Sequence, residues 1–267
     1  MLPNGPPAPG LSLHLRFLPC LLLNFLLAAP VLAAPALCPE HFARGQAPDV
    51  PLRLAAGARA VCYHAFAVLH SPISRTALYS AERLTAARVR AARQTPRESE
   101  FRTERALPPD ERAELSDYAR SGFDRGHLAP SGNMPDAESQ QESFSLANIV
   151  PQAPALNRGL WEGIESAVRT LALKEGALYV VTGPIFAGSD LEAVGNVLVP
   201  TSLWKAVLDP RRRRAAAYLV ENRDGTGWRS ISMAQLRRLT GITVFPGASP
   251  WRLRLPNPAP TRSGARR

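Results

Sequence analysis

The chain has 267 residues, of which 45% are hydrophobic, so it can bury a sizeable core and wholesale disorder is excluded. Its formal charge of +10 is carried almost entirely by arginine, with Lys174 and Lys205 as the only lysines. Guanidinium groups match phosphate oxygens bidentately and a basic chain attracts polyanions, which favours nucleic acid as a partner. The abundance of alanine and proline is equally compatible with a genomic bias towards arginine codons.

Residues 1–34 are typical of a secretory signal peptide. Arg16 precedes an apolar stretch at 17–27, and alanines up to Ala34 supply the small residues of a cleavage site. A transmembrane anchor is the weaker alternative, because the stretch is shorter than the ~20 residues of a span and Asn24 and Pro30 interrupt it. We therefore expect export to the periplasm or beyond, with no membrane anchor after cleavage.

Export changes the interpretation of the cysteines, since Cys20 would leave with the signal peptide. Cys38 and Cys62 remain, and an even pair in an oxidising compartment predicts a disulfide. The bond would tie residues 35–60, expected to form an irregular arm rich in proline and alanine, to a strand that starts near Val61. A zinc site made by these cysteines with His41 and His64 is a weaker alternative.

We expect a single α+β domain over residues 61–249, because no internal repeat or long linker divides it. β-branched and aromatic content predicts strands, and apolar residues spaced by three and four predict helices. The expected strands are 61–70, 77–84, 145–150, 178–182, 194–199, 203–208 and 215–221, with a hairpin turn at 209–214. The expected helices are 110–119, 136–143 with Asp136 as its cap, 156–175 ended by Gly176, and 232–239. Residues 250–267, rich in proline and arginine, are expected to be a loose tail.

The run Asp124-Arg125-Gly126-His127 is the first candidate for chemistry. Asp124 could accept a hydrogen bond from one ring nitrogen of His127 and leave the other free as a base. Gly126 permits close approach of the backbone, and Arg125 supplies a charge for phosphate. A packed or surface histidine at a strand end is the alternative.

The helix expected at 156–175 carries a polar ridge. Asn157, Trp161, Glu165 and Arg169 recur every four residues and share one helix face. Asn157 and Glu165 offer oxygen ligands suited to a hard cation such as Mg²⁺, and Arg169 could hold phosphate. By spacing alone, a solvated polar face with Trp161 in the core is the favoured interpretation.

Three motifs extend this pattern: Asp-Arg-Gly-His-Leu-Ala-Pro at 124–130, Phe-Ser-Leu-Ala-Asn-Ile-Val-Pro-Gln at 144–152, and Asn-Arg-Gly-Leu-Trp at 157–161 followed by Glu165. Asn157 lies thirty positions after His127, and Glu165 eight after Asn157. The chain therefore resembles the DNA/RNA non-specific endonucleases, the ββα-metal (His-Me finger) group that includes endonuclease G. The resemblance runs from about Cys62 to Asn222 and implies a mainly antiparallel central sheet flanked by helices.

The resemblance also implies roles for the matching residues. His127 would be the general base, Asn157 the direct ligand of one Mg²⁺, and Glu165 the acid that helps to hold this ion through water. Arg169 and an upstream arginine, here Arg97 with Arg102 and Arg105 as alternatives, would contact phosphate together with Arg125. Asn148 and Gln152 would be polar substrate-site residues.

The implied reaction is Mg²⁺-dependent hydrolysis of DNA and RNA that leaves 5′-phosphate ends, with Mn²⁺ as a substitute. His127, with an ordinary pKa of about 6.5, would deprotonate water at neutral pH. Recognition would be of the backbone, because no sequence-reading module is evident. A non-catalytic exported nucleic-acid-binding protein and a hydrolase of small phosphodiesters are the alternative functions, and a homodimer is left open.

Overall fold

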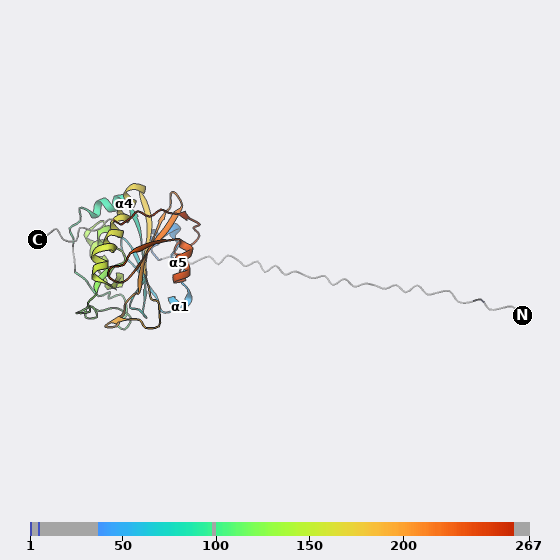
Figure 1. The fold of residues 1–267 in the computed structure, drawn as a ribbon, viewed down its shortest axis with the longest axis horizontal. Helices are drawn as coiled ribbons and strands as arrows, with labels where there is room; N and C mark the ends of the chain where they lie inside the picture. Colours follow the sequence, from blue (N-terminus) through green and yellow to red (C-terminus); the bar gives the residue numbers. More distant parts are fainter. Residues whose placement is uncertain (2–4, 6–36, 98–99, 259–267) are drawn as a thin grey trace. The chain divides into compact units, whose positions relative to one another are not determined.

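A mainly antiparallel sheet of eight strands runs through the centre of the fold (Figure 1). Its spatial order is β1 (Arg59–Cys62), β2 (Ala67–Ser71), β3 (Thr76–Thr85), β6 (Ala177–Ile185), β9 (Ser202–Asp209), β10 (Arg214–Glu221) and β11 (Trp228–Ile231). The eighth strand, β12 (Trp251–Arg252), runs parallel to the start of β10. This computed structural model describes residues 1, 5, 37–97 and 100–258. Apart from residues 1 and 5, the signal peptide expected at 1–34 lies outside the described residues.

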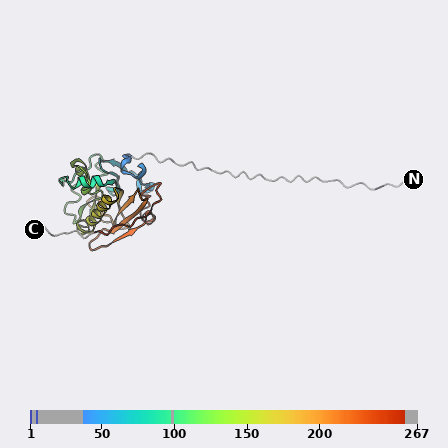
Figure 2. The same ribbon diagram turned by 90° about the horizontal axis from the view of Figure 1, so that it is seen from above.

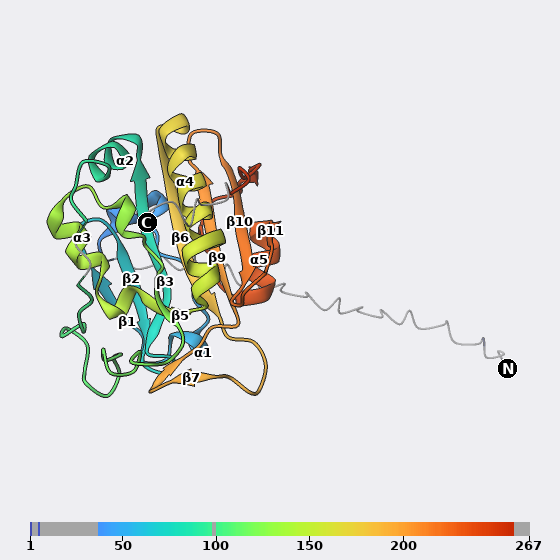
Figure 3. The ribbon, with the colours of Figure 1, turned by 60° about the vertical axis from the view of Figure 1, so that its left-hand side comes forward.

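One face of the sheet is covered by α2 (Ala86–Ala92), α4 (Glu162–Glu175) and the hairpin of β4 (Asp124–His127) and β5 (Ile149–Gln152). Val89, Val150 and Ile164 from these elements join one hydrophobic core with Val180 and Val207 of the sheet. Helix α4, yellow in Figures 2 and 3, lies against the strands on this side.

The other face is covered by the N-terminal segment and by α5 (Met233–Thr240). Phe42 and Leu236 from these elements pack in a second core with Val181 and Ala206. Neighbouring strand residues thus enter opposite cores, as the two-residue period of a strand requires, and the sheet is buried on both sides.

Short elements connect these layers. They are the 3₁₀ turns η1 (Pro39–His41), η2 (Ala43–Gly45), η3 (Ser131–Asn133) and η4 (Leu146–Asn148), the helices α1 (Leu52–Ala55) and α3 (Ala137–Ser143), and the two-stranded ribbon of β7 (Ala193–Val194) and β8 (Val197–Leu198).

Several local predictions are confirmed. The Asp136 side chain caps α3 by accepting a hydrogen bond from the backbone N–H of Ser139 (2.8 Å). The hairpin joining β9 and β10 turns where expected. The helix expected at 156–175 exists, but it begins as a π-helical turn, η5 (Leu156–Trp161), before α4 continues to Glu175. Gly176 ends it with a φ of 90°.

Several element predictions are wrong. The strand expected at 145–150 is mostly the 3₁₀ turn η4, which leads into β5 at Ile149, and the strand expected at 194–199 is the β7–β8 ribbon, which turns at residues 195–196. Residues 61–70 form a tight hairpin of β1 and β2 rather than one strand, because the chain turns at His64. No helix forms at 110–119, where the chain makes successive turns. There the Asp117 carboxylate accepts backbone hydrogen bonds from Glu114 (2.7 Å) and Asn196 (3.0 Å), so a side chain supplies the bonds that a helix would have made.

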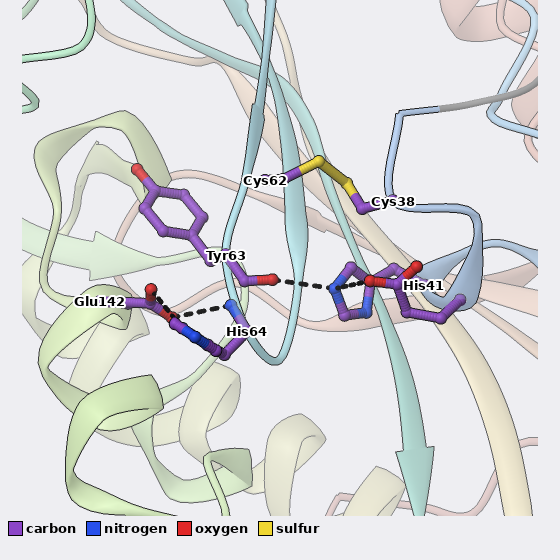
Figure 4. Close-up of a disulfide and its surroundings, with 7 residues drawn as sticks. Cys38, His41, Cys62, Tyr63, His64 and Glu142 are labelled. Atoms are coloured by element: carbon purple, nitrogen blue, oxygen red, sulfur yellow. Dashed lines mark hydrogen bonds and ion pairs between the residues drawn. A yellow bond between two sulfur atoms is a disulfide. The ribbon is translucent and has the colours of Figure 1, made fainter.

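The two ends of the described range 37–258 pack against the rest of the domain. A disulfide joins Cys38 to Cys62 at the end of β1, and the Nε2 atom of the buried His41 lies 3.0 Å from the carbonyl oxygen of Tyr63 (Figure 4). At the other end, Leu253 and Leu255 are buried although residues 250–267 were expected to be a loose tail. Within residues 37–97 and 100–258, no helix combines the length and apolar character that crossing a bilayer requires.

Candidate active site

The β4–β5 hairpin carries His127. In this pairing Asp124 lies opposite Gln152 and His127 lies opposite Ile149. A Cβ atom on Gly126 would stand 2.1 Å from Oε1 of Gln152, so only glycine lets the two strands approach as they do. This close approach fixes the strand that presents the histidine.

A cleft of about 500 Å³ opens between this hairpin and the start of the helix. It collects seven of the residues expected at the site, namely Arg97, Asp124, Arg125, His127, Asn157, Glu165 and Arg169. Arg158 and Glu162, from the same helical segment, also line it. Of the three candidate upstream arginines, Arg97 lines this cleft, whereas Arg102 and Arg105 line a different pocket.

Asp124 does not contact the ring of His127, contrary to our expectation. Its carboxylate accepts hydrogen bonds from Nδ2 of Asn157 (2.9 Å) and from Arg158 (2.8 and 2.5 Å). Residues three apart in a strand point to opposite faces, which separates the two side chains. Because the amide nitrogen of Asn157 is held by Asp124, its amide oxygen is the atom left for a ligand in the cleft.

The ring of His127 is packed between aromatic side chains. Phe144 meets it edge-on at a centroid distance of 4.7 Å, and Phe101 lies at 5.6 Å, with the guanidinium of Arg125 over the Phe101 ring. The Nε2 atom is buried with no hydrogen-bond partner in the described part of the chain. Burial, together with the positive charge of Arg97, lowers the pKa of His127 to about 3. The pKa of His127 in this structure thus lies below the ordinary value expected from the sequence, and the ring is neutral at pH 7.

Three buried side chains hydrogen-bond the backbone of residues 127–129, which starts at His127. Trp161 Nε1 donates to the carbonyl oxygen of His127 (3.3 Å), and Lys205 Nζ donates to that of Leu128 (3.0 Å). The Asn148 amide bonds both the N–H (3.0 Å) and the carbonyl (2.8 Å) of Ala129. Lys205 also lies over the Trp161 ring at 5.0 Å, which joins two members of this backbone clamp.

A match to known proteins accounts for this arrangement. A family model described as DNA/RNA non-specific endonuclease matches residues 47–250. The chain belongs to this family. It is therefore a nuclease, a hydrolase that acts on phosphodiester bonds.

Individual relatives agree with this family. Nuclease C1 of Cunninghamella echinulata var. echinulata is 34% identical over 201 residues, covering 67% of this chain and 80% of that protein. Mitochondrial nuclease EXOG of Danio rerio is 30% identical over 213 residues, and mitochondrial endonuclease G of Homo sapiens is 34% identical over 155. These alignments cover 71% and 54% of this chain but span only 62% and 52% of the two mitochondrial proteins.

A solved structure supports the fold. The crystal structure of the EndoG/EndoGI complex superposes with a TM-score of 0.61 at 23% identity, covering 68% of this chain and 84% of that one. The ββα-metal fold expected from the sequence is therefore confirmed, with β4, β5 and the η5–α4 segment forming its ββα unit.

In this endonuclease, Asn148 and Gln152 lie inside the protein rather than in the cleft. Both are 0% exposed. Besides Ala129, Asn148 bonds Ser80 (2.7 Å) and the carbonyl of Ser143 (2.9 Å), so all its polar atoms are engaged by protein. The expectation that these two residues bind substrate is not met, because substrate cannot reach them.

A buried charge network behind the cleft of the endonuclease is not predicted by the sequence analysis. Glu82 on β3 accepts a hydrogen bond from Nδ2 of Asn133 (2.9 Å), whose Oδ1 faces Arg169 at 3.4 Å. Burial raises the pKa of Glu82 to about 7, opposed by the charge of Lys205, and burial likewise raises the pKa of Glu165. A lysine within the apolar strand pattern of residues 203–208, Lys205, is the sequence signal that could have revealed it.

The donor set in the cleft fits a hard divalent cation. The amide oxygen of Asn157 and the carboxylates of Glu165 and Glu162 are oxygen donors on one helical segment. In residues 37–97 and 100–258, no three His, Cys, Asp or Glu side chains converge as a metal-binding group. The zinc alternative finds no support in the geometry, because Cys38 and Cys62 are bonded to each other, His41 bonds a backbone carbonyl, and His64 pairs with Glu142 (Figure 4).

Proposed function

We propose that the chain is an exported, Mg²⁺-dependent endonuclease that cleaves DNA and RNA without sequence specificity, with His127 as its general base. The observation that carries the proposal is the juxtaposition in one cleft of a neutral imidazole and an oriented amide oxygen. Burial keeps His127 unprotonated, and Asp124 turns the oxygen of Asn157 towards the cleft. Mn²⁺ would serve as a substitute, because it takes the same oxygen ligands.

Each residue has a step to perform. His127 accepts a proton from water while the water oxygen forms its bond to phosphorus, and the bond from phosphorus to the 3′ oxygen breaks. Arg97, Arg125 and Arg169 line the cleft and balance the charge that develops on the phosphoryl oxygens. Asn157 and Glu165 would hold the cation, which would supply Lewis-acid stabilisation when bound. The departing 3′ oxygen takes a proton from solvent, so the products carry a 5′-phosphate and a 3′-hydroxyl.

Recognition of the backbone explains the absence of sequence preference. The cleft presents four arginines, Arg97, Arg125, Arg158 and Arg169, and only Arg158 is ion-paired among them within the described chain. Contacts between guanidinium groups and phosphate do not distinguish bases, and they require release of counterions. Cleavage should therefore fall steeply as salt rises.

The decisive experiment compares the purified protein with a His127→Ala variant on plasmid DNA and on a long RNA, with Mg²⁺ or with EDTA. Wild type should cut both polymers with Mg²⁺ alone, and the product ends should accept label from a kinase only after phosphatase treatment. His64→Ala is the matched control, because His64 is exposed and pairs with Glu142 away from the cleft. Equal survival of DNA with wild type and His127→Ala would leave only a binding function, and cutting of dinucleotides alone would indicate a small-phosphodiester hydrolase.

Export is a separate part of the proposal. The signal-like sequence at 1–34 and the disulfide between Cys38 and Cys62 are both suited to an oxidising compartment. Fractionation of a bacterial expression host, with N-terminal sequencing of the product, tests it. An intact N-terminus in the cytosolic fraction would contradict export and leave the nuclease assignment untouched.

A further inference from the structure

An exposed tryptophan lies beside a run of arginines at the end of the sheet opposite to the cleft end of α4. Residues 211–214 are four consecutive arginines in the β9–β10 turn, and all are exposed. The backbone N–H of Trp251 donates to the carbonyl oxygen of Arg213 (2.8 Å), and Trp251 pairs with Arg214 in the sheet. Trp251 is 76% exposed, and no other aromatic side chain in the described part of the chain is left as open.

The segment that carries Trp251 is firmly attached. Its backbone continues the pairing, with the N–H of Leu253 bonded to the carbonyl of Ala215 (3.0 Å). Leu253 and Leu255 enter the core, and the hydroxyl of Tyr218 donates to the carbonyl of Pro256 (2.8 Å). The tryptophan is therefore presented on a fixed support, although a side chain of this size normally gains free energy from burial.

Alternation along the segment turns two more arginines outward. Arg252 and Arg254 are exposed on either side of the buried Leu253, and together with Ser230 they line a groove of about 310 Å³. Trp251, Arg252 and Arg254 lie just beyond residues 47–250, the part of the chain that the family model matches, whereas Ser230 and the arginines of the turn lie within it.

The positive charge here is largely unopposed. Arg212 pairs with Glu175 at the end of α4 and lies 3.6 Å from Asp209. Among the salt bridges of the described residues, none involves the side chains of Arg211, Arg213, Arg214 or Arg254. An exposed aromatic ring that pairs in the sheet with Arg214 and precedes Arg252 in the chain has neighbours suited to single-stranded nucleic acid, where bases stack on the ring and phosphates meet arginines.

We propose that Trp251 with Arg211, Arg213, Arg214, Arg252 and Arg254 forms a second nucleic-acid site, the tryptophan–arginine site, which binds an unpaired stretch of a polynucleotide. Unpaired bases are required because the bases of a duplex are stacked on one another and cannot cover the ring. The site deepens the proposed nuclease function and rests on it, since it would hold a substrate whose scissile phosphate lies in the cleft.

Helix α4 runs from the cleft to the arginine turn, so its length gives the scale of the separation between the two sites. Its first turns carry Glu162 and Glu165 of the cleft, and Glu175 at its other end pairs with Arg212. Fourteen residues of α-helix span about 21 Å, which corresponds to about six nucleotides of a stacked strand at 3.4 Å each. Strands clearly longer than six nucleotides can therefore reach both sites, and shorter ones cannot.

The test measures binding and cleavage separately. In a His127→Ala background with EDTA, Trp251→Ala and a double Arg213→Gln, Arg214→Gln variant should each bind a 20-nucleotide oligo(dT) about fivefold or more weakly. Binding should quench tryptophan fluorescence, and the quenching should disappear in Trp251→Ala because the other three tryptophans are buried or half-buried. In the active enzyme, the same changes should raise KM for the 20-mer and leave cleavage of a tetranucleotide unchanged.

Arg238→Gln is the matched control, because Arg238 is exposed on α5, which covers the other face of the sheet. Thermal melts verify that each variant is folded. Unchanged binding of the 20-mer by Trp251→Ala overturns the proposal. If Trp251→Ala instead binds anionic lipid vesicles more weakly than wild type while its oligo(dT) binding is unaffected, the surface belongs to membranes and the proposal is again overturned. If wild type cuts no nucleic acid but oligo(dT) binding still depends on Trp251, the proposed nuclease function fails while the second site stands.

Discussion

The ammonium group of Lys205 donates a hydrogen bond of 3.0 Å to the carbonyl oxygen of Leu128, the residue after His127. Lys205 is 1% exposed, and its second hydrogen bond, of 2.7 Å, goes to Thr182 on the neighbouring strand. The central sheet thus holds the backbone beside the proposed base through a charged group that substrate cannot touch.

Lys205→Met should lower kcat by about tenfold or more with KM nearly unchanged, because small displacements of a catalytic group are costly while substrate contacts are intact. It should also reduce the free energy of unfolding by about 3 kcal/mol, since the carbonyl of Leu128 loses its donor and the buried Glu82 loses a nearby positive charge. Steady-state kinetics and urea unfolding measure both. Lys174→Met, a change of the exposed second lysine, is the control, and a wild-type kcat in Lys205→Met would refute the positioning role.

Asp124→Asn should raise the Mg²⁺ concentration needed for half-maximal cleavage by about tenfold. The carboxylate now fixes which way the Asn157 amide faces, and loss of such an outer partner typically weakens metal sites by this amount or more. A metal titration at saturating DNA measures the change. Glu111→Gln, which disturbs only the pair with Arg59 away from the cleft, serves for comparison. An unaltered titration curve for Asp124→Asn would show that the orientation of Asn157 does not depend on Asp124.

Acid should destabilise the fold through His41 and His70. Burial lowers the pKa of both, and each has an Nε2 atom at a backbone carbonyl and an Nδ1 atom buried without a partner among the described residues. Since the folded pKa lies below the unfolded value of about 6.5, the unfolded chain binds more protons as pH falls. Stability is therefore complete above pH 6.5 and declines below it.

Urea unfolding at pH 7.5 and at pH 5 tests this dependence. His70→Gln, which can still donate to the carbonyl of Glu111 but cannot be protonated, should lose less stability between the two pH values than wild type. An equal loss in both proteins would assign the acid sensitivity to other groups.

The proposed base predicts an unusual pH profile for activity. Because the pKa of His127 is lowered to about 3, its ring is already neutral at pH 5. A plot of kcat/KM against pH should therefore stay level as the pH falls through 6.5, with no acid limb centred near that value. A clear acid limb centred near that value would indicate that His127 titrates normally in the working enzyme.

The disulfide should contribute about 3 kcal/mol to stability, because it closes a loop of 24 residues between Cys38 and Cys62. For a chain of this size that is a fall in Tm of about 6–12 °C on reduction. Thermal melts with and without dithiothreitol measure this fall in Tm. A Cys38→Ser, Cys62→Ser variant should melt at the lower temperature, and dithiothreitol should not change its Tm. A melting temperature of wild type that dithiothreitol leaves unchanged would contradict this contribution.

The sequence by itself determined the features that depend on neighbouring residues. The apolar spacing of α4, the cap at Asp136, the turn between β9 and β10 and the end of the helix at Gly176 are all local, and so is the thirty-residue spacing that joins His127 to Asn157 in one motif set. An even pair of cysteines likewise indicated the disulfide between Cys38 and Cys62.

Only the tertiary structure decided what each polar group meets. Asp124 accepts a hydrogen bond from Asn157 and none from His127, since the strand turns the side chains of Asp124 and His127 to opposite faces. The pKa of His127 and the interior position of Asn148 follow from burial, which depends on elements distant in the chain. Lys205 bonds Leu128, 77 positions away in the chain. Trp251 pairs with Arg214 of the arginine turn, a strand pairing that the proline-rich composition of residues 250–267 does not predict. Contacts of this separation are set by how the layers pack, and no local pattern of residues encodes them.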